Sequence, residues 1–149
     1  MTSASSFQQN FVFFEELNLS TWKPPVCSLQ WNPIGTTMAG DAKGVAGITG
    51  NRLNEPRDIF IDAFKTLYIA DYANNRVQKW LLGAAAATTV AGQQNGVAGA
   101  NPEQLNQPGG LVVDSSGNIY VVDSRNNRVQ SWLVGAAAGT TIAGKGRTA

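Results

Sequence analysis

A block of forty residues occurs twice in this chain of 149 residues, at an offset of 52 positions. Residues 53–92 and residues 105–144 are identical at 21 aligned positions. A repeat of this length indicates one supersecondary unit that has been copied and stacked, because a single copy cannot bury its own apolar face. The repeat therefore constrains the architecture more strongly than the function, since repeat scaffolds carry many activities.

Each copy divides into four short extended segments rich in β-branched and aromatic residues. In the first copy these segments are residues 57–62, 67–71, 76–82 and 88–91, and in the second they are residues 109–114, 119–123, 128–134 and 140–143. Short turns with glycine, serine and asparagine separate them, which favours strands over helices. The alanine runs that follow Gly83 and Gly135 are too short to form helices alone, so we expect them to be connections.

Three motifs in each copy resemble the NHL repeat. In the second copy they read Pro108-Gly-Gly-Leu-Val-Val-Asp114, Ile119-Tyr-Val-Val-Asp123 and Asn126-Asn-Arg-Val-Gln130. The resemblance implies an all-β fold, a β-propeller that is usually built from six four-stranded blades. Two full repeats cannot close such a ring, so we expect a partial β-propeller of four-stranded NHL-type blades, either as a piece of a larger propeller or as a unit completed by association.

The remaining segments are assigned from what they share with the repeats. Thr36 to Gly40 resembles the end of the first full repeat, although residues 1–25 lack the motifs that should precede it. The expected organisation is an irregular N-terminal segment (1–25), a degenerate partial blade (26–40), two NHL repeat blades (53–92 and 105–144) and a tail (145–149).

Most of the polar and aromatic motif residues recur in register, which favours a structural role because a site of chemistry is needed only once. The aspartates are expected to bond turn amides, the asparagines to occupy tight turns and the arginines to bridge strands or blades. The tryptophans are expected to fill the space between blades. These structural motif residues are Asp62, Asp71, Asn74, Arg76, Trp80, Asp114, Asp123, Asn126, Arg128 and Trp132.

Residues that differ between the two copies are better candidates for contacts with a partner, because packing does not require them. Arg57-Asp58 stands where the second copy has Gly109-Gly110, and Tyr72-Ala73 stands where it has Ser124-Arg125. We therefore take Arg57, Tyr72 and Arg125 as the candidate binding residues.

The composition argues against catalysis. The chain has no histidine and one cysteine, so a histidine-held zinc or a Ser-His-Asp arrangement is not expected, and we predict no metal, no cofactor and no enzymatic activity. The resemblance also covers amidating lyases, but their zinc is held by histidines. The expected function is therefore a non-catalytic scaffold that binds a protein partner.

Three further expectations concern partners and location. The resemblance includes single-stranded RNA-binding modules and substrate-recruiting parts of ubiquitin ligases, but a net charge of +1 makes RNA the weaker alternative. Exposed blade edges of an unclosed propeller favour self-association. No signal peptide or transmembrane segment is recognisable in the sequence, so a cytoplasmic location is expected.

Overall fold

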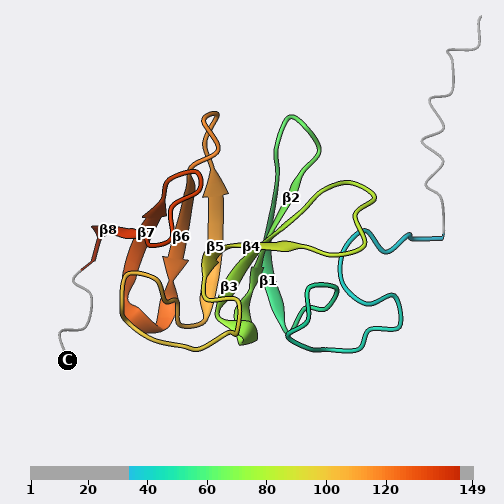
Figure 1. The fold of residues 1–149 in the computed structure, drawn as a ribbon, viewed down its shortest axis with the longest axis horizontal. Coiled ribbons are helices and arrows are strands. Elements are labelled where there is room, and N and C mark those ends of the chain that lie inside the picture. Colours follow the sequence, from blue (N-terminus) through green and yellow to red (C-terminus); the bar gives the residue numbers. More distant parts are fainter. Residues whose placement is uncertain (1–33, 145–149) are drawn as a thin grey trace, which may run out of the picture. The chain divides into compact units, whose positions relative to one another are not determined.

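The computed structural model of the chain describes residues 34–144. Within this part, Thr36 onward belongs to one compact unit that holds two four-stranded antiparallel sheets with strand orders β1-β2-β3-β4 and β5-β6-β7-β8. Figure 1 shows the first sheet in green and yellow and the second in orange and red. The two repeats therefore fold as two sheets of the same topology, which confirms the all-β, partial-propeller prediction.

The strand boundaries lie close to those expected from sequence. The first sheet consists of β1 (Pro56–Ile61), β2 (Leu67–Asp71), β3 (Arg76–Trp80) and β4 (Thr88–Gly92). The second consists of β5 (Pro108–Val113), β6 (Ile119–Asp123), β7 (Arg128–Trp132) and β8 (Thr140–Ala143). The third strand of each sheet ends at its tryptophan, two residues earlier than expected, because the chain turns at residues 81–82 and 133–134 and leaves these side chains in solvent.

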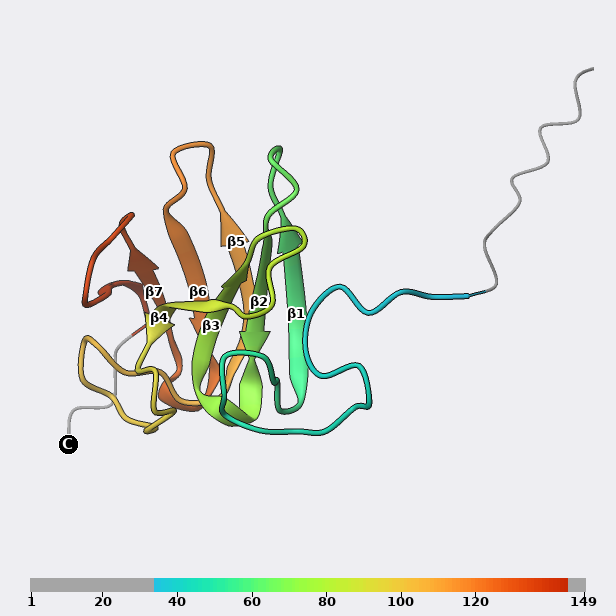
Figure 2. The same cartoon turned by 45° about the vertical axis from the view of Figure 1, so that its right-hand side comes forward.

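A single helical turn links the second and third strands of each sheet. These turns are η1 (Tyr72–Asn74) and η2 (Ser124–Asn126). Each is followed by an asparagine in the left-handed conformation, Asn75 with φ 53° and Asn127 with φ 51°. Asparagine tolerates this conformation better than most residues, so it allows the chain to reverse direction into β3 and β7. Figures 1 and 2 show η1 and η2 on one side of the sheets and the β1–β2 and β5–β6 turns on the other.

The main apolar core lies between the two sheets. Tyr68, Ala70 and Val77 of the first sheet share one buried cluster with Val121 and Trp132 of the second. Trp132 is 1% exposed. The equivalent Trp80 is also buried, in a second cluster that includes Ala39 and Leu53 and therefore lies on the opposite side of the first sheet.

The uncovered apolar side chains lie on the outward faces of the sheets. Ile59 and Ile61 are exposed on the first sheet, and Val112 and Val122 are exposed on the second. Each of these residues lies within a strand that has a hydrogen-bonded neighbour. Each sheet also has two edge strands, β1 and β4 in the first and β5 and β8 in the second, so association through the blade edges stays a prediction.

The partial blade expected at residues 26–40 lies mostly outside the described residues. Residues 34–40 form no strand in the structure. Ala39 nevertheless packs into the cluster with Trp80, and Gly40 has a positive φ of 85°, as Gly92 does at the equivalent position. The segments 1–25 and 145–149 also lie outside the described residues, so their assignments stay predictions.

Gly92, at the end of β4, is expected to tolerate no side chain. Its φ is +76°, and a Cβ there would lie 2.5 Å from the carbonyl oxygen of Asn75. Gly83 has a similar φ of +78°, but nothing lies within 4 Å of its Cβ position. Gly83→Ala should therefore cost only the left-handed strain of about 1–2 kcal/mol. Gly92→Ala should cost about 1–3 kcal/mol more because the backbone must shift.

Urea unfolding of the two variants, followed by tryptophan fluorescence, measures this difference. Equal losses in the free energy of unfolding would mean that the close approach of Gly92 to Asn75 is relieved without cost.

Candidate functional site

A buried ion pair closes the turn between β2 and β3. The Nε atom of Arg76 donates to Oδ2 of Asp71 at 2.8 Å, and the two side chains are 1% and 0% exposed. The pair forms because antiparallel pairing of β2 with β3 sets these two residues directly opposite each other. A charge-assisted bond of this length, away from water, orients both side chains firmly.

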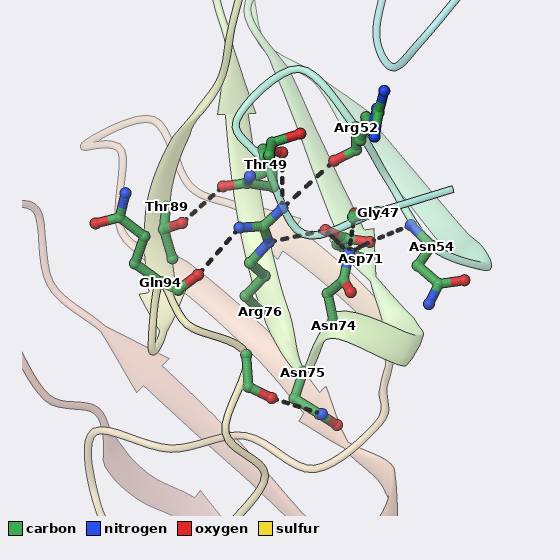
Figure 3. A network of polar contacts seen from close by, with 12 residues as sticks. Gly47, Thr49, Arg52, Asn54, Asp71, Asn74, Asn75, Arg76, Thr89 and Gln94 are labelled. Atoms are coloured by element: carbon green, nitrogen blue, oxygen red, sulfur yellow. Dashed lines mark hydrogen bonds and ion pairs between the residues drawn. The ribbon is translucent and has the colours of Figure 1, made fainter. Parts of the chain in front are cut away.

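Other polar atoms of the pair bind the loop that precedes β1 and, at Gln94, the loop that follows β4, as Figure 3 shows. Asp71 accepts a bond from the amide of Asn54 at 2.7 Å and bonds from the side chain of Asn74. The guanidinium of Arg76 donates to the carbonyl oxygens of Thr49 and Arg52, each at 3.4 Å. The ion pair therefore fastens the incoming loop onto the sheet.

The second sheet repeats this network. Arg128 Nε donates to Oδ2 of Asp123 at 2.8 Å, and Asn126 donates to the same oxygen at 2.8 Å. The guanidinium of Arg128 also donates to three carbonyl oxygens of the loop that crosses from the first sheet: those of Ala100, Asn101 and Gln104. In both sheets the aspartate oxygens and the guanidinium nitrogens of the buried ion pair thus bond to other groups of the chain. This leaves the ion pairs little capacity to bind a ligand.

Asp62 and Asp114 hold the turns on the opposite side of the sheets. Their pKa values are lowered, mainly by the backbone amide of Thr66 for Asp62 and by the side chain and amide of Asn118 for Asp114. Tyr120 donates its hydroxyl to Asp114 at 3.1 Å, which raises the pKa of Tyr120. Because the aspartate pKa values are lowered, these bonds stabilise the fold above the ordinary aspartate pKa and are lost as the pH falls through the lowered value.

A cleft of about 1000 Å³ lies beside these turns, between the two sheets. Its lining includes the aromatic rings of Phe60 and Phe64 and the side chain of Val134. The carboxylates of Asp62 and Asp114 also line it, but they accept bonds from their own turns. The cleft therefore combines apolar surface with the cation of Lys79, which also lines it.

The three candidate binding residues, which come from different elements, meet on the other side of the sheets. The guanidinium carbon of Arg57, in β1, lies 4.1 Å from the ring centroid of Tyr72, in η1. The Tyr72 hydroxyl donates to Oε1 of Gln107 at 3.0 Å, and Nε of Arg125, in η2, donates to the same oxygen at 2.6 Å. We call Arg57, Tyr72, Gln107 and Arg125 the seam cluster, because it joins the two sheets.

The seam cluster presents two cations to solvent. The side chains of Arg57 and Arg125 are exposed, whereas those of Tyr72 and Gln107 are half-buried. The Arg57 guanidinium stacks on an aromatic face, a contact worth about 0.5–1 kcal/mol at an exposed site. Arg57 also lies 3.9 Å from the exposed carboxylate of Glu55, which partly offsets its charge.

Sequence reasoning missed two residues at this seam. Gln107 accepts a bond from Arg125 within its own repeat and a bond from Tyr72 across the interface, and its own amide donates to Oδ1 of Asn75 at 2.9 Å. Asp58 accepts a bond from the amide of Leu111 across the same interface at 2.8 Å. Both positions differ between the repeats, as Gln107 against Glu55 and Asp58 against Gly110, so the criterion that selected Arg57 could also have found them.

Two general features of the described residues bear on chemistry and location. Among residues 34–144, no three histidine, cysteine, aspartate or glutamate side chains come together as a metal site would require. No helix in this part of the chain has the length and apolar character needed to cross a membrane.

Comparison with known proteins identifies the repeat. Residues 105–131 match the family model of the NHL repeat, and this range holds β5, β6, η2 and most of β7. None of the curated proteins compared with the chain matches it significantly. The first sheet repeats the strand order and the buried Asp-Arg pair of the second. Residues 105–131 thus carry an NHL repeat, and the described part of the chain is a partial β-propeller of two four-stranded blades.

Proposed function

We propose that this chain is a non-catalytic interaction module that binds a protein partner through the seam cluster. The observation that most directly supports this proposal is that Oε1 of Gln107 accepts bonds from both Tyr72 and Arg125, while Arg57 stacks on Tyr72. Residues from both sheets are thereby held in one exposed group. A binding surface preorganised in this way loses less conformational entropy when a partner docks.

The chemistry of the seam cluster favours an acidic peptide segment as the ligand. Arg57 and Arg125 supply planar guanidinium groups, which bind carboxylates with two parallel hydrogen bonds. Among the guanidinium nitrogens of Arg125, only Nε donates a hydrogen bond within residues 34–144, and the side chain is exposed, so its terminal nitrogens are open to a ligand. Tyr72 adds an aromatic surface of the kind enriched at energetically important interface positions.

Several features support a role without catalysis. The chain contains no histidine, so the commonest general base at neutral pH is not available. The buried carboxylates of Asp71 and Asp123 are bound by arginine and by backbone amides. Substrate recruitment for a ubiquitin ligase is one role that such a module could serve, and it rests on the family resemblance alone.

Selection of peptides from a random dodecapeptide library displayed on phage tests the proposal. The selected sequences should be rich in aspartate and glutamate. The best peptide should bind Arg57→Gln and Arg125→Gln about tenfold more weakly, equivalent to about 1.4 kcal/mol for each lost contact. Lys65→Gln removes a cation from the β1–β2 turn, on the opposite side, and should leave the affinity unchanged.

Two outcomes would overturn the proposal. Peptide affinities that do not respond to the arginine substitutions would exclude the seam cluster as the binding surface. Tighter binding of a single-stranded RNA oligonucleotide than of any selected peptide, with a steep salt dependence, would favour the RNA-binding alternative.

A further inference from the structure

A pocket of about 370 Å³ lies in the first sheet, where the loop that precedes β1 meets β3 and β4. Its volume is at the lower end of the range for small-molecule sites, about 300–1,000 Å³. Two of the lining side chains, those of Arg76 and Gln78, are each only 1% exposed. The other lining residues are small or polar: Gly50, Ala87, Thr88, Thr89, Gly92 and Gln94. The pocket is therefore polar, its wall includes two buried side chains, and it shares no residue with the seam cluster.

The amide nitrogen of Gln78 is a free donor in this pocket. Oε1 of Gln78 accepts a bond from the hydroxyl of Thr89 at 2.8 Å, whereas Nε2 makes no hydrogen bond within residues 34–144. Gln130, the equivalent residue of the second sheet, likewise accepts a bond from Thr141 and has no partner for its Nε2 in the described part of the chain. A buried donor without an acceptor is costly. A ligand that accepts from Gln78 would remove that cost.

The backbone acceptors at the pocket are already used. The carbonyl oxygen of Gln94 accepts from Nη1 of Arg76 at 3.2 Å, and that of Gly50 accepts from the amide of Ala87 at 2.9 Å. The hydroxyl of Thr88, by contrast, makes no hydrogen bond within residues 34–144, so it is free to donate. The pocket thus offers donors, and it suits a ligand group that only accepts hydrogen bonds.

The charge of the pocket favours an anion. Among the described residues that line it, only Arg76 is charged. Its partner Asp71 binds Nε, whereas Nη1 points to Gln94, and Figure 3 shows these two residues on opposite sides of the guanidinium. Arg76 also holds the incoming loop less closely than Arg128 does, with two Nη2 bonds of 3.4 Å against 3.1 Å for the equivalent bonds. The ion pair is neutral as a whole, but its positive end lies at the pocket.

We propose that this pocket binds the carboxylate of a small organic acid. An ionised carboxylate has two oxygens that only accept hydrogen bonds, so it bonds to Nε2 of Gln78 and to the hydroxyl of Thr88 without adding an unpaired donor. Bonds to a charged group are stronger than bonds between neutral groups. Arg76 has little hydrogen-bonding capacity left, so it acts through its charge, in a partly buried site where electrostatic attraction is stronger than in water.

Nuclear magnetic resonance titration of the isotopically labelled full chain, with sodium acetate and with sodium succinate, tests this assignment. The side-chain amide resonances of Gln78, identified by their loss in Gln78→Leu, should shift and saturate. The backbone amides of Gly50 and Gly92, which line the pocket, should shift with them. Sodium chloride at the same ionic strength should not produce saturable shifts at these positions.

Matched substitutions locate the site. Gln78→Leu removes the free donor and should weaken the binding about tenfold or more, as expected for a lost hydrogen bond to a charged group. Gln130→Leu makes the same change in the second sheet and should leave the affinity unchanged. Thr88→Val alters an exposed position, so it should fold normally, and it should weaken the binding about threefold to tenfold. The backbone amide spectrum of each variant shows whether it is folded.

Three results would overturn the proposal. The first is a wild-type chain in which neither acetate nor succinate causes saturable shifts at the lining residues. The second is that sodium chloride causes the same shifts, which would indicate a general effect of salt. The third is an affinity that is unchanged in both Gln78→Leu and Thr88→Val, which would place the bound acid elsewhere on the chain.

Discussion

Replacement of Asp71 by alanine is expected to lower the free energy of unfolding by about 3–5 kcal/mol, because it leaves a buried guanidinium without its carboxylate. Arg76 is 1% exposed and cannot reach water without unpacking the turn. The substitution also removes the acceptor for the amide of Asn54. A small domain has only about 5–15 kcal/mol of stability, so this loss is a large fraction of the total.

Chemical unfolding monitored by tryptophan fluorescence measures this effect, and the repeat supplies an internal replicate. Asp123→Ala should cause a similar loss, because Asp123 has the same buried pair with Arg128. Asp41→Ala is the matched control, since Asp41 forms a half-exposed pair with Arg52 at 3.5 Å, which is expected to contribute about 1 kcal/mol. Losses of comparable size for Asp41→Ala and Asp71→Ala would refute the assignment of Asp71 as a buried anchor.

Trp132→Ala is expected to destabilise the fold by about 3–5 kcal/mol, the range for truncation of a large buried aromatic side chain. The Trp132 ring packs in the cluster that joins the two sheets. Its removal therefore creates a cavity in the interface as well as within the second sheet. The size of the loss depends on how far the neighbouring side chains can collapse into the space.

The control for this prediction is the adjacent residue. Leu133 is 64% exposed, so Leu133→Ala should change the free energy of unfolding by less than about 0.5 kcal/mol. A loss below about 1 kcal/mol for Trp132→Ala would indicate that the two sheets are only weakly coupled. A change in the slope of the unfolding curve would indicate that the sheets unfold separately.

The residues of the seam cluster show how far sequence comparison can reach. Arg57, Tyr72 and Arg125 were selected because they differ between the copies, and the structure brings all three together. Gln107 was not selected, although it is the acceptor that links Tyr72 to Arg125. Its role depends on the positions of two side chains 35 and 18 residues away in sequence. No local pattern encodes such distances.

The exposed apolar residues on the sheet faces show the opposite limit. The sequence predicts exposed edges for an unclosed array of blades, and the structure additionally leaves apolar residues exposed on the faces of the sheets. Alternation along a strand indicates that one side is apolar, but here both faces of β2 and of β6 are apolar, as is typical of strands that are covered on both sides in a stacked array. Sequence alone therefore could not distinguish a face that has a neighbour, such as that of Leu111, from one that lacks it, such as that of Ile59.

The sequence by itself determined the repeat unit, its four strands and the turns that join them. These features depend on contacts within about forty residues and on local conformational preferences, such as the tolerance of asparagine for the left-handed region at Asn75 and Asn127. The tertiary structure alone decided which face of each sheet is covered, which carbonyl oxygens Arg76 and Arg128 bind, and which side chains meet at Gln107. Those outcomes depend on how the two sheets stack, and stacking joins residues from different repeats that no local pattern connects.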